Sequence, residues 1–193
     1  MPIQPVSLPD ASAPGLAALF ALGTRVGDAL AARGETVAVA ESSAGGLVSA
    51  ALLARPGASA YYLGGAVVYT RRAVRRLTAL TPADATGIRS SSLPWARLLA
   101  RHQRQRFRAT WAIAETGAAG PDGNPYGDPA GHTCLAVAGP IEADRLLQTG
   151  DCDRAANMLA FAGAALALLE EAISAAPREP LPKGIEARDE PRR

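Results

Sequence analysis

The stretch VAVAESSAGG, residues 37–46, predicts a turn that joins a strand to a helix. Residues 37–40 are small or β-branched and apolar, which predicts a short buried strand. The apolar run after the two glycines, residues 47–53, predicts a helix that ends at a Pro-Gly pair. At such a turn the first N–H groups of the helix lack partners, so we expect them to favour an anion or a developing oxyanion. The alternative is an ordinary turn in which Ser42 or Ser43 caps the helix.

The composition is that of a folded protein with one domain. The chain has 193 residues, of which 48% are apolar and 20% are charged, and this balance is not that of a disordered protein. Cys134 and Cys152 lie far apart and form no C-x-x-C pattern, so we predict neither a disulfide framework nor a zinc site. With no disulfide framework we expect a reducing, cytoplasmic location. Residues 1–15 contain no Lys or Arg and no apolar run, so we expect no signal peptide.

The longest apolar stretch is residues 155–169, which is interrupted by Asn157. A bilayer-spanning helix needs about 20 apolar residues, and this stretch is shorter. We therefore expect a buried core helix here and no membrane association.

Helix and strand patterns alternate along the chain and predict an α/β fold. The expected helices are 14–33, 47–53, 71–76, 93–108 and 154–175, and the expected strands are 37–40, 64–70, 109–115, 132–138 and 145–149. A hairpin-sized loop joins the last two strands, so we expect a mixed sheet in a three-layer α/β/α sandwich. We expect a single domain over residues 14–176, preceded by a flexible arm (1–13) and followed by a disordered Pro- and Arg-rich tail (177–193).

Arginine supplies nearly all of the positive charge, since Lys183 is the single lysine. Arginine stays protonated at working pH, so it binds anions but is a poor base. Arg71, Arg72, Arg75 and Arg76 form two like-charged i,i+4 pairs, which predict either a solvated helix face or a face with an anion opposite. A nucleic-acid surface is a third interpretation, but the net charge is only +2, so we expect no nucleic-acid partner.

The segment at residues 116–131 is a long loop rich in Gly and Pro. Such loops are uncommon in compact domains unless they bind something. We therefore expect this loop to take part in a binding site.

Three segments match one known family in order and spacing. AESSAGG (40–46) resembles the signature A-E-S-C-T-G-G, and PGASA (56–60) with GAVVY (65–69) resembles a P-G-S-S segment followed by a G-x-V-x-Y strand. TGAAGPDG (116–123) is similar to a T-G-I-A-G-P-x-G loop. Together they resemble the CinA C-terminal domain family, the nicotinamide mononucleotide deamidases called PncC, over about residues 15–175. The family is also described as competence- or damage-inducible, and this chain resembles a divergent member.

The resemblance implies the family's fold and an amidohydrolase activity in pyridine nucleotide salvage. The reaction is hydrolysis of the carboxamide of nicotinamide mononucleotide to nicotinate mononucleotide and ammonia, without a metal or cofactor. The resemblance makes Ser42 the nucleophile, assisted by Tyr69, and implies a homo-oligomer whose partner is a small pyridine nucleotide. The substrate-binding residues that it implies lie in the two Gly-rich segments: Glu41, Ser43, Ala44, Gly45, Gly46, Thr116, Gly117, Gly120 and Pro121.

The chain departs from the family pattern at three places in the expected site. Val74 stands five residues after Tyr69, where the family has a lysine base, and the signature's Cys and Thr are Ser43 and Ala44. The family's K-P-V-G-T appears as DPAGH (128–132), which reverses a charge.

These departures leave two hypotheses. One is an active amidohydrolase with a substitute base, for which Glu41 and His132 are the candidates. The other is a catalytically impaired relative that binds a pyridine nucleotide as a sensor or interaction module.

Overall fold

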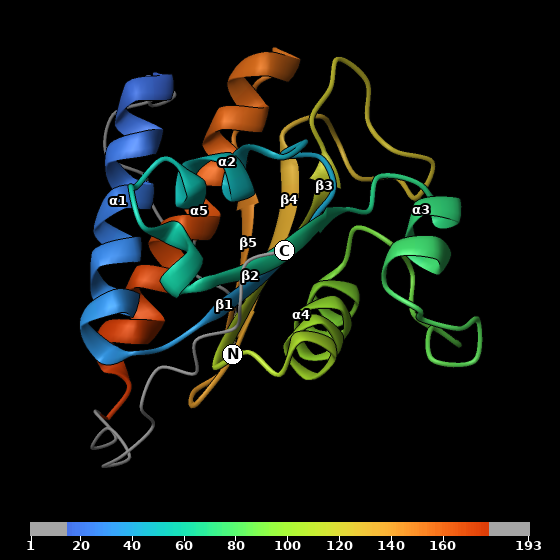
Figure 1. The fold of residues 1–193 in the computed structure, drawn as a ribbon. Coiled ribbons are helices and arrows are strands. Elements are labelled where there is room, and N and C mark those ends of the chain that lie inside the picture. The colour runs from blue at the N-terminus through green and yellow to red at the C-terminus, as the bar shows by residue number, and fades with distance from the viewer. Residues whose placement is uncertain (1–14, 178–193) are drawn as a thin grey trace.

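A mixed five-stranded sheet forms the middle layer of the fold (Figure 1). The computed structural model describes residues 15–177. The strands are β1 (Val37–Glu41), β2 (Tyr62–Val67), β3 (Trp111–Ala118), β4 (His132–Ala138) and β5 (Ala143–Gln148), and they lie in the order β2-β1-β3-β4-β5. Strand β1 is parallel to β2 and β3, whereas β4 is antiparallel to both β3 and β5. The predicted mixed sheet is confirmed.

Helices cover both faces of this sheet, which confirms the three-layer α/β/α sandwich (Figure 1). On one face α1 (Leu16–Arg33), α2 (Leu47–Leu53) and α5 (Arg154–Ala175) pack together. On the other face lies α4 (Leu93–Phe107), and the short α3 (Arg71–Leu77) follows β2.

Side chains along the strands alternate between these two faces. Val39 and Ile113 pack in the cluster beneath α1 and α5, whereas Ala40, Ala114 and Ala136 pack in the cluster beneath α4. Because these three alanines are side by side in the strand register, the sheet surface under α4 is shallow, and α4 packs closely on it.

Four of the five predicted strands have different bounds in the structure, and β1 continues by one residue to Glu41. Strand β2 ends at Val67 instead of Thr70, because the Thr70 hydroxyl accepts a hydrogen bond from the N–H of Ala73 and begins α3. Strand β3 starts at Trp111 and runs to Ala118, because the residues after Glu115 still pair with β4. Strand β5 starts and ends slightly earlier than predicted, whereas β4 has the predicted bounds.

The domain boundaries remain predictions. The N-terminal arm (1–13) and, apart from residue 177, the C-terminal tail (177–193) lie outside the described residues.

Within residues 15–177, α5 is the one helix whose length and mean hydropathy of 1.6 suit a membrane span. Phe161, Leu166 and Leu169 of this helix are fully buried in the core, against α1 and the sheet. This packing accounts for the apolar composition of α5, and α5 is a core helix of this fold.

Candidate functional site

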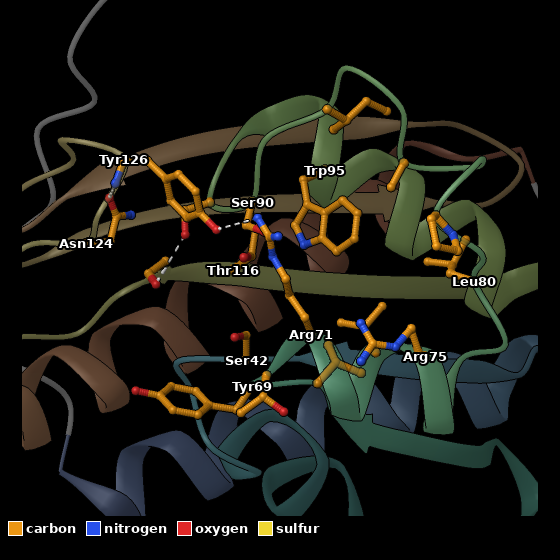
Figure 2. Close-up of a pocket in the computed structure, with 18 of the residues that line it drawn as sticks. Ser42, Tyr69, Arg71, Arg75, Leu80, Ser90, Trp95, Thr116, Asn124 and Tyr126 are labelled. Carbon is orange, nitrogen blue, oxygen red and sulfur yellow. Dashed lines mark hydrogen bonds between the residues drawn. The ribbon is translucent and has the colours of Figure 1, made fainter.

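A cavity of about 610 Å³ lies at the carboxyl ends of the parallel strands β1, β2 and β3 (Figure 2). In α/β sheets this edge is where ligands usually bind, because loops from several strands converge there. The residues that line the cavity are Ser42, Val68, Tyr69, Thr70, Arg71, Val74, Arg75, Leu80, Thr81, Pro82, Ala85, Ile88, Ser90, Ser91, Trp95, Thr116, Gly117, Asn124, Pro125 and Tyr126.

Four predicted site residues meet in this cavity. Ser42 follows β1, Tyr69 follows β2, and Thr116 and Gly117 lie near the end of β3. Figure 2 shows Ser42, Tyr69 and Thr116 around one hollow. The structure therefore brings together residues from all three segments that carried the family resemblance.

The other predicted binding residues do not line the cavity. They are Glu41, Ser43, Ala44, Gly45, Gly46, Gly120 and Pro121. Glu41, Ser43 and Ala44 are buried behind Ser42, where they shape the turn.

The Glu41 carboxylate caps helix α2. It accepts hydrogen bonds from the N–H groups of Gly46 (2.9 Å), Val48 (3.0 Å) and Ser49 (3.1 Å), and from the Ser49 hydroxyl (2.6 Å). Neither serine of the turn caps α2, so that alternative prediction is wrong. With both of its oxygens engaged and its side chain fully buried, Glu41 has no access to the cavity as a base.

A second buried carboxylate, Glu115 of β3, holds the turn itself. Its Oε2 accepts hydrogen bonds from the N–H groups of Ser42 (3.0 Å) and Ala44 (2.8 Å). Its Oε1 accepts from the hydroxyls of Ser43 and Thr133. Burial raises the pKa of Glu115, and these four hydrogen bonds oppose the rise.

The predicted free N–H groups at the start of α2 are not free, because the two carboxylates and carbonyls of the turn accept from them. Those of Ala44, Gly46, Val48 and Ser49 donate to Glu115 or Glu41, and those of Gly45 and Leu47 donate to carbonyls of the turn. These donors are not available to an anion or an oxyanion. The sequence did not reveal this, because the role of Glu115 depends on the register of β1 against β3.

Tyr69 is tied to the start of α5. Its side chain is largely exposed, and its Oη accepts a hydrogen bond from Arg154 (3.1 Å). The Arg154 guanidinium also donates to the carbonyl of Gly120 (2.6 Å) and lies 5.8 Å from the centroid of the Tyr69 ring. Arg154 therefore joins the end of β2 to the Gly-rich loop, a role that no sequence motif indicated.

The four arginines of α3 divide into two pairs. Arg71 and Arg75 line the cavity, whereas Arg72 and Arg76 are exposed outside it. All four side chains are exposed, so the predicted solvated face holds for both pairs, and one pair also borders the cavity. Arg71 donates a hydrogen bond to the Tyr126 hydroxyl (3.4 Å), and hydrogen bonds with Ser90 and Arg71 lower the pKa of Tyr126.

Val74 stands in the cavity wall between these arginines. No lysine occurs within residues 15–177, so none lines the cavity.

His132, at the start of β4, is buried and does not line the cavity. Its Nε2 lies 3.0 Å from the carbonyl of Ser91 and 3.7 Å from Oδ1 of Asp128. Neither candidate for a substitute base, Glu41 or His132, therefore reaches the space beside Ser42.

The reversed charge at Asp128 is neutralised locally. Both of its carboxylate oxygens accept hydrogen bonds from Arg89, and this pairing lowers the pKa of Asp128. Asp128 does not line the cavity, so its charge is held away from a ligand there. No group of three or more His, Cys, Asp or Glu side chains in the described part of the chain is arranged to hold a metal ion.

A family model described as the CinA C-terminal domain matches residues 20–173. The chain belongs to the CinA C-terminal domain family.

Relatives and solved structures of this family resemble the chain along most of its length. A CinA-like protein of Prochlorococcus marinus (strain MIT 9313) is 42% identical over 123 residues, which are 64% of this chain and 29% of that protein. A CinA-like protein of Anaeromyxobacter sp. (strain K) is 42% identical over 135 residues, which are 68% of this chain and 33% of that protein. The chain thus spans about a third or less of the length of these curated relatives.

Crystal structures of similar proteins share the fold. The competence/damage inducible protein CihA from Agrobacterium tumefaciens is 31% identical, with a TM-score of 0.74, and the match covers 83% of this chain and 97% of that one. The competence damage-inducible protein A (ComA) from Klebsiella pneumoniae subsp. pneumoniae MGH 78578 is 27% identical, with a TM-score of 0.75, covering 81% and 98%. A competence-damaged protein (CinA) superfamily protein from Klebsiella pneumoniae 700603 is 29% identical, with a TM-score of 0.74, covering 81% and 98%. The three-layer fold of this chain is that of the CinA superfamily.

Proposed function

We propose that the chain is an amidohydrolase that converts nicotinamide mononucleotide to nicotinate mononucleotide and ammonia, with Ser42 as the nucleophile. One observation carries this proposal: Ser42, Tyr69 and Thr116, from the three segments that resemble the family, line one cavity of about 610 Å³. That volume lies within the usual range of small-molecule sites, which is about 300–1,000 Å³.

In the proposed reaction the Ser42 oxygen adds to the carboxamide carbon of the substrate. The hydroxyl proton leaves, the C–N bond breaks, and ammonia departs with that proton. Water then hydrolyses the resulting ester, releases the carboxylate product and restores the hydroxyl. Tyr69 supports this reaction as a donor, because its oxygen accepts from Arg154 while its own hydrogen remains available to the substrate.

The group that accepts the proton in the first step differs between this chain and the family. Val74 replaces the lysine, and Glu41 and His132 do not line the cavity. We propose that water in the cavity takes the proton. A positioned general base typically contributes about 10²–10⁴-fold, so turnover by this chain is expected to be slow.

The second candidate function is binding of a pyridine nucleotide without hydrolysis, as a sensor or interaction module. The apolar Val74 in the cavity wall favours it, because the cavity is then retained without a base.

Ammonia release from nicotinamide mononucleotide, followed together with binding measured by calorimetry, distinguishes the two functions. The proposed function predicts ammonia and nicotinate mononucleotide in equal amounts. Binding without ammonia would establish the second candidate, and folded protein that neither binds nor hydrolyses would exclude both.

A further inference from the structure

Two guanidinium groups of α3 border the same cavity as Ser42. Arg71 and Arg75 are four residues apart, so they lie on one face of the helix, and both line the cavity. Figure 2 shows Arg71 reaching from α3 toward Tyr126, with which it makes a hydrogen bond.

The charge of this pair is not neutralised by the described part of the protein. Within residues 15–177, neither Arg71 nor Arg75 has a carboxylate oxygen within 4.0 Å, whereas Arg55, Arg89 and Arg97 each form a salt bridge. The cavity lining also contains no Asp or Glu. Adjacent like charges are unfavourable, so an anion between them would relieve a repulsion that is built into the helix.

Beside the arginines the wall is apolar. It includes Val74, Leu80, Ile88 and Trp95. A ligand that fits both the arginines and this apolar wall has a compact dianionic group at one end and an apolar or aromatic part next to it.

We propose that Arg71 and Arg75 bind the phosphate group of a phosphate monoester whose remaining part extends through the cavity toward Ser42. Guanidinium groups suit this role because their planar N–H donors match the phosphate oxygens and keep their charge at any working pH. The identification of that ester as a mononucleotide rests on the proposed function, whereas the phosphate subsite itself does not.

The first test uses inorganic phosphate and the full chain. The test variant is Arg71→Gln/Arg75→Gln, and the control is Arg72→Gln/Arg76→Gln, which removes the same charge from the same helix outside the cavity. Phosphate is expected to raise the midpoint of thermal unfolding of the wild type and the control but not of the test variant. Equal shifts in all three proteins, or no shift in any, would overturn the subsite whether or not the chain hydrolyses an amide.

The second test compares two ligands by calorimetry in a Ser42→Ala background, in which turnover does not interfere. Loss of both guanidinium contacts is expected to weaken the binding of nicotinamide mononucleotide by about a hundredfold. Nicotinamide riboside, which lacks the phosphate, is expected to bind the test variant and the control equally. An equal loss for both ligands would overturn the proposal, because the arginines would then not read the phosphate. Failure of the amidase alone leaves these binding results intact, so the two proposals fail separately.

Discussion

Glu115 is a buried carboxylate that holds the turn carrying Ser42, and no cation within residues 15–177 forms a salt bridge with it. Burial raises the pKa of Glu115 above its ordinary value of 4.5. At pH values between the ordinary pKa and the raised pKa, Glu115 holds a proton more often in the folded state than in the unfolded state. The free energy of unfolding therefore falls as the pH rises through this range.

Replacement of Glu115 by Gln is expected to remove this pH dependence. The stability of Glu115→Gln relative to the wild type should therefore increase from pH 4 upward and level off above the raised pKa. Urea unfolding of both proteins across this range measures the difference, in which contributions from all other groups cancel. A difference independent of pH would show that Glu115 is not the titrating group.

The second residue-level prediction concerns the missing base. Val74 lines the cavity, so Val74→Lys is expected to place an amine near Ser42 and to raise the rate of ammonia release by about 10²-fold or more. Val74→Met is the control, since it adds length without an amine. Equal rates for the two variants would contradict the account of Val74 as the lost base position.

At the residue level the sequence predicted which residues line the cavity, but not the hydrogen bonds that hold the turn behind them. Ser42, Tyr69 and Thr116 were predicted because three segments resemble the motifs of one family, and all three residues line the cavity. The helix-capping role of Glu41 and the turn-holding role of Glu115 were missed, because neither follows from spacing along the chain. Both depend on how β1 lies against α2 and β3.

The Gly-rich loop after β3 is held at Gly120 by two features of the backbone. Gly120 has a φ of 110°, and a Cβ there would lie 2.6 Å from the carbonyl oxygen of Cys152. Its own carbonyl accepts from Arg154, which also contacts Tyr69. The loop, the end of β2 and the start of α5 therefore meet at this glycine.

Gly120→Ala is expected to destabilise the protein by more than Gly127→Ala. Gly127 also has a positive φ, 90°, but a Cβ there would meet nothing within 4 Å, so its substitution adds only backbone strain of about 1–3 kcal/mol. The clash with the Cys152 carbonyl adds to that strain at Gly120. Urea denaturation measures both variants, and equal losses would mean that the loop moves freely away from Cys152.

At the level of elements, the predictions were most accurate where the pattern was long and regular. Strand β4 and helix α5 have the predicted bounds. Strand β3 continues into the TGA of the glycine-rich motif, because pairing with β4 outweighs the low strand preference of glycine. The division of the α3 arginines followed the predicted i,i+4 pairing, but which pair faces the cavity needed the tertiary structure.

For the whole molecule, the order of strand and helix patterns was sufficient to predict the three-layer fold with a mixed sheet. It was not sufficient to predict the cavity at the carboxyl ends of the parallel strands. The cavity depends on residues 81–92, for which the sequence predicted neither a helix nor a strand and which contribute Thr81, Ile88 and Ser90 to its wall.

The predicted homo-oligomer is a proposal supported by the edge of the sheet. Strand β2 is an edge strand, and Leu63 and Val67 on it are each 41% exposed. Exposed strand edges with apolar side chains favour association. Sedimentation of the full chain is expected to show an oligomer that Leu63→Lys/Val67→Lys converts toward the monomer, and a wild type that is monomeric at high concentration would contradict this.

The most direct test of the proposed function is ammonia release from nicotinamide mononucleotide by the wild type, Ser42→Ala and Ser49→Ala. Ser42 lines the cavity, whereas Ser49 lies outside it on α2 and hydrogen-bonds Glu41. Loss of a catalytic nucleophile typically lowers the rate by about 10³-fold or more, so we expect Ser42→Ala to abolish release and Ser49→Ala to retain it. Equal release by the wild type and Ser42→Ala, or none from the folded wild type, would contradict the assignment of Ser42 as the nucleophile.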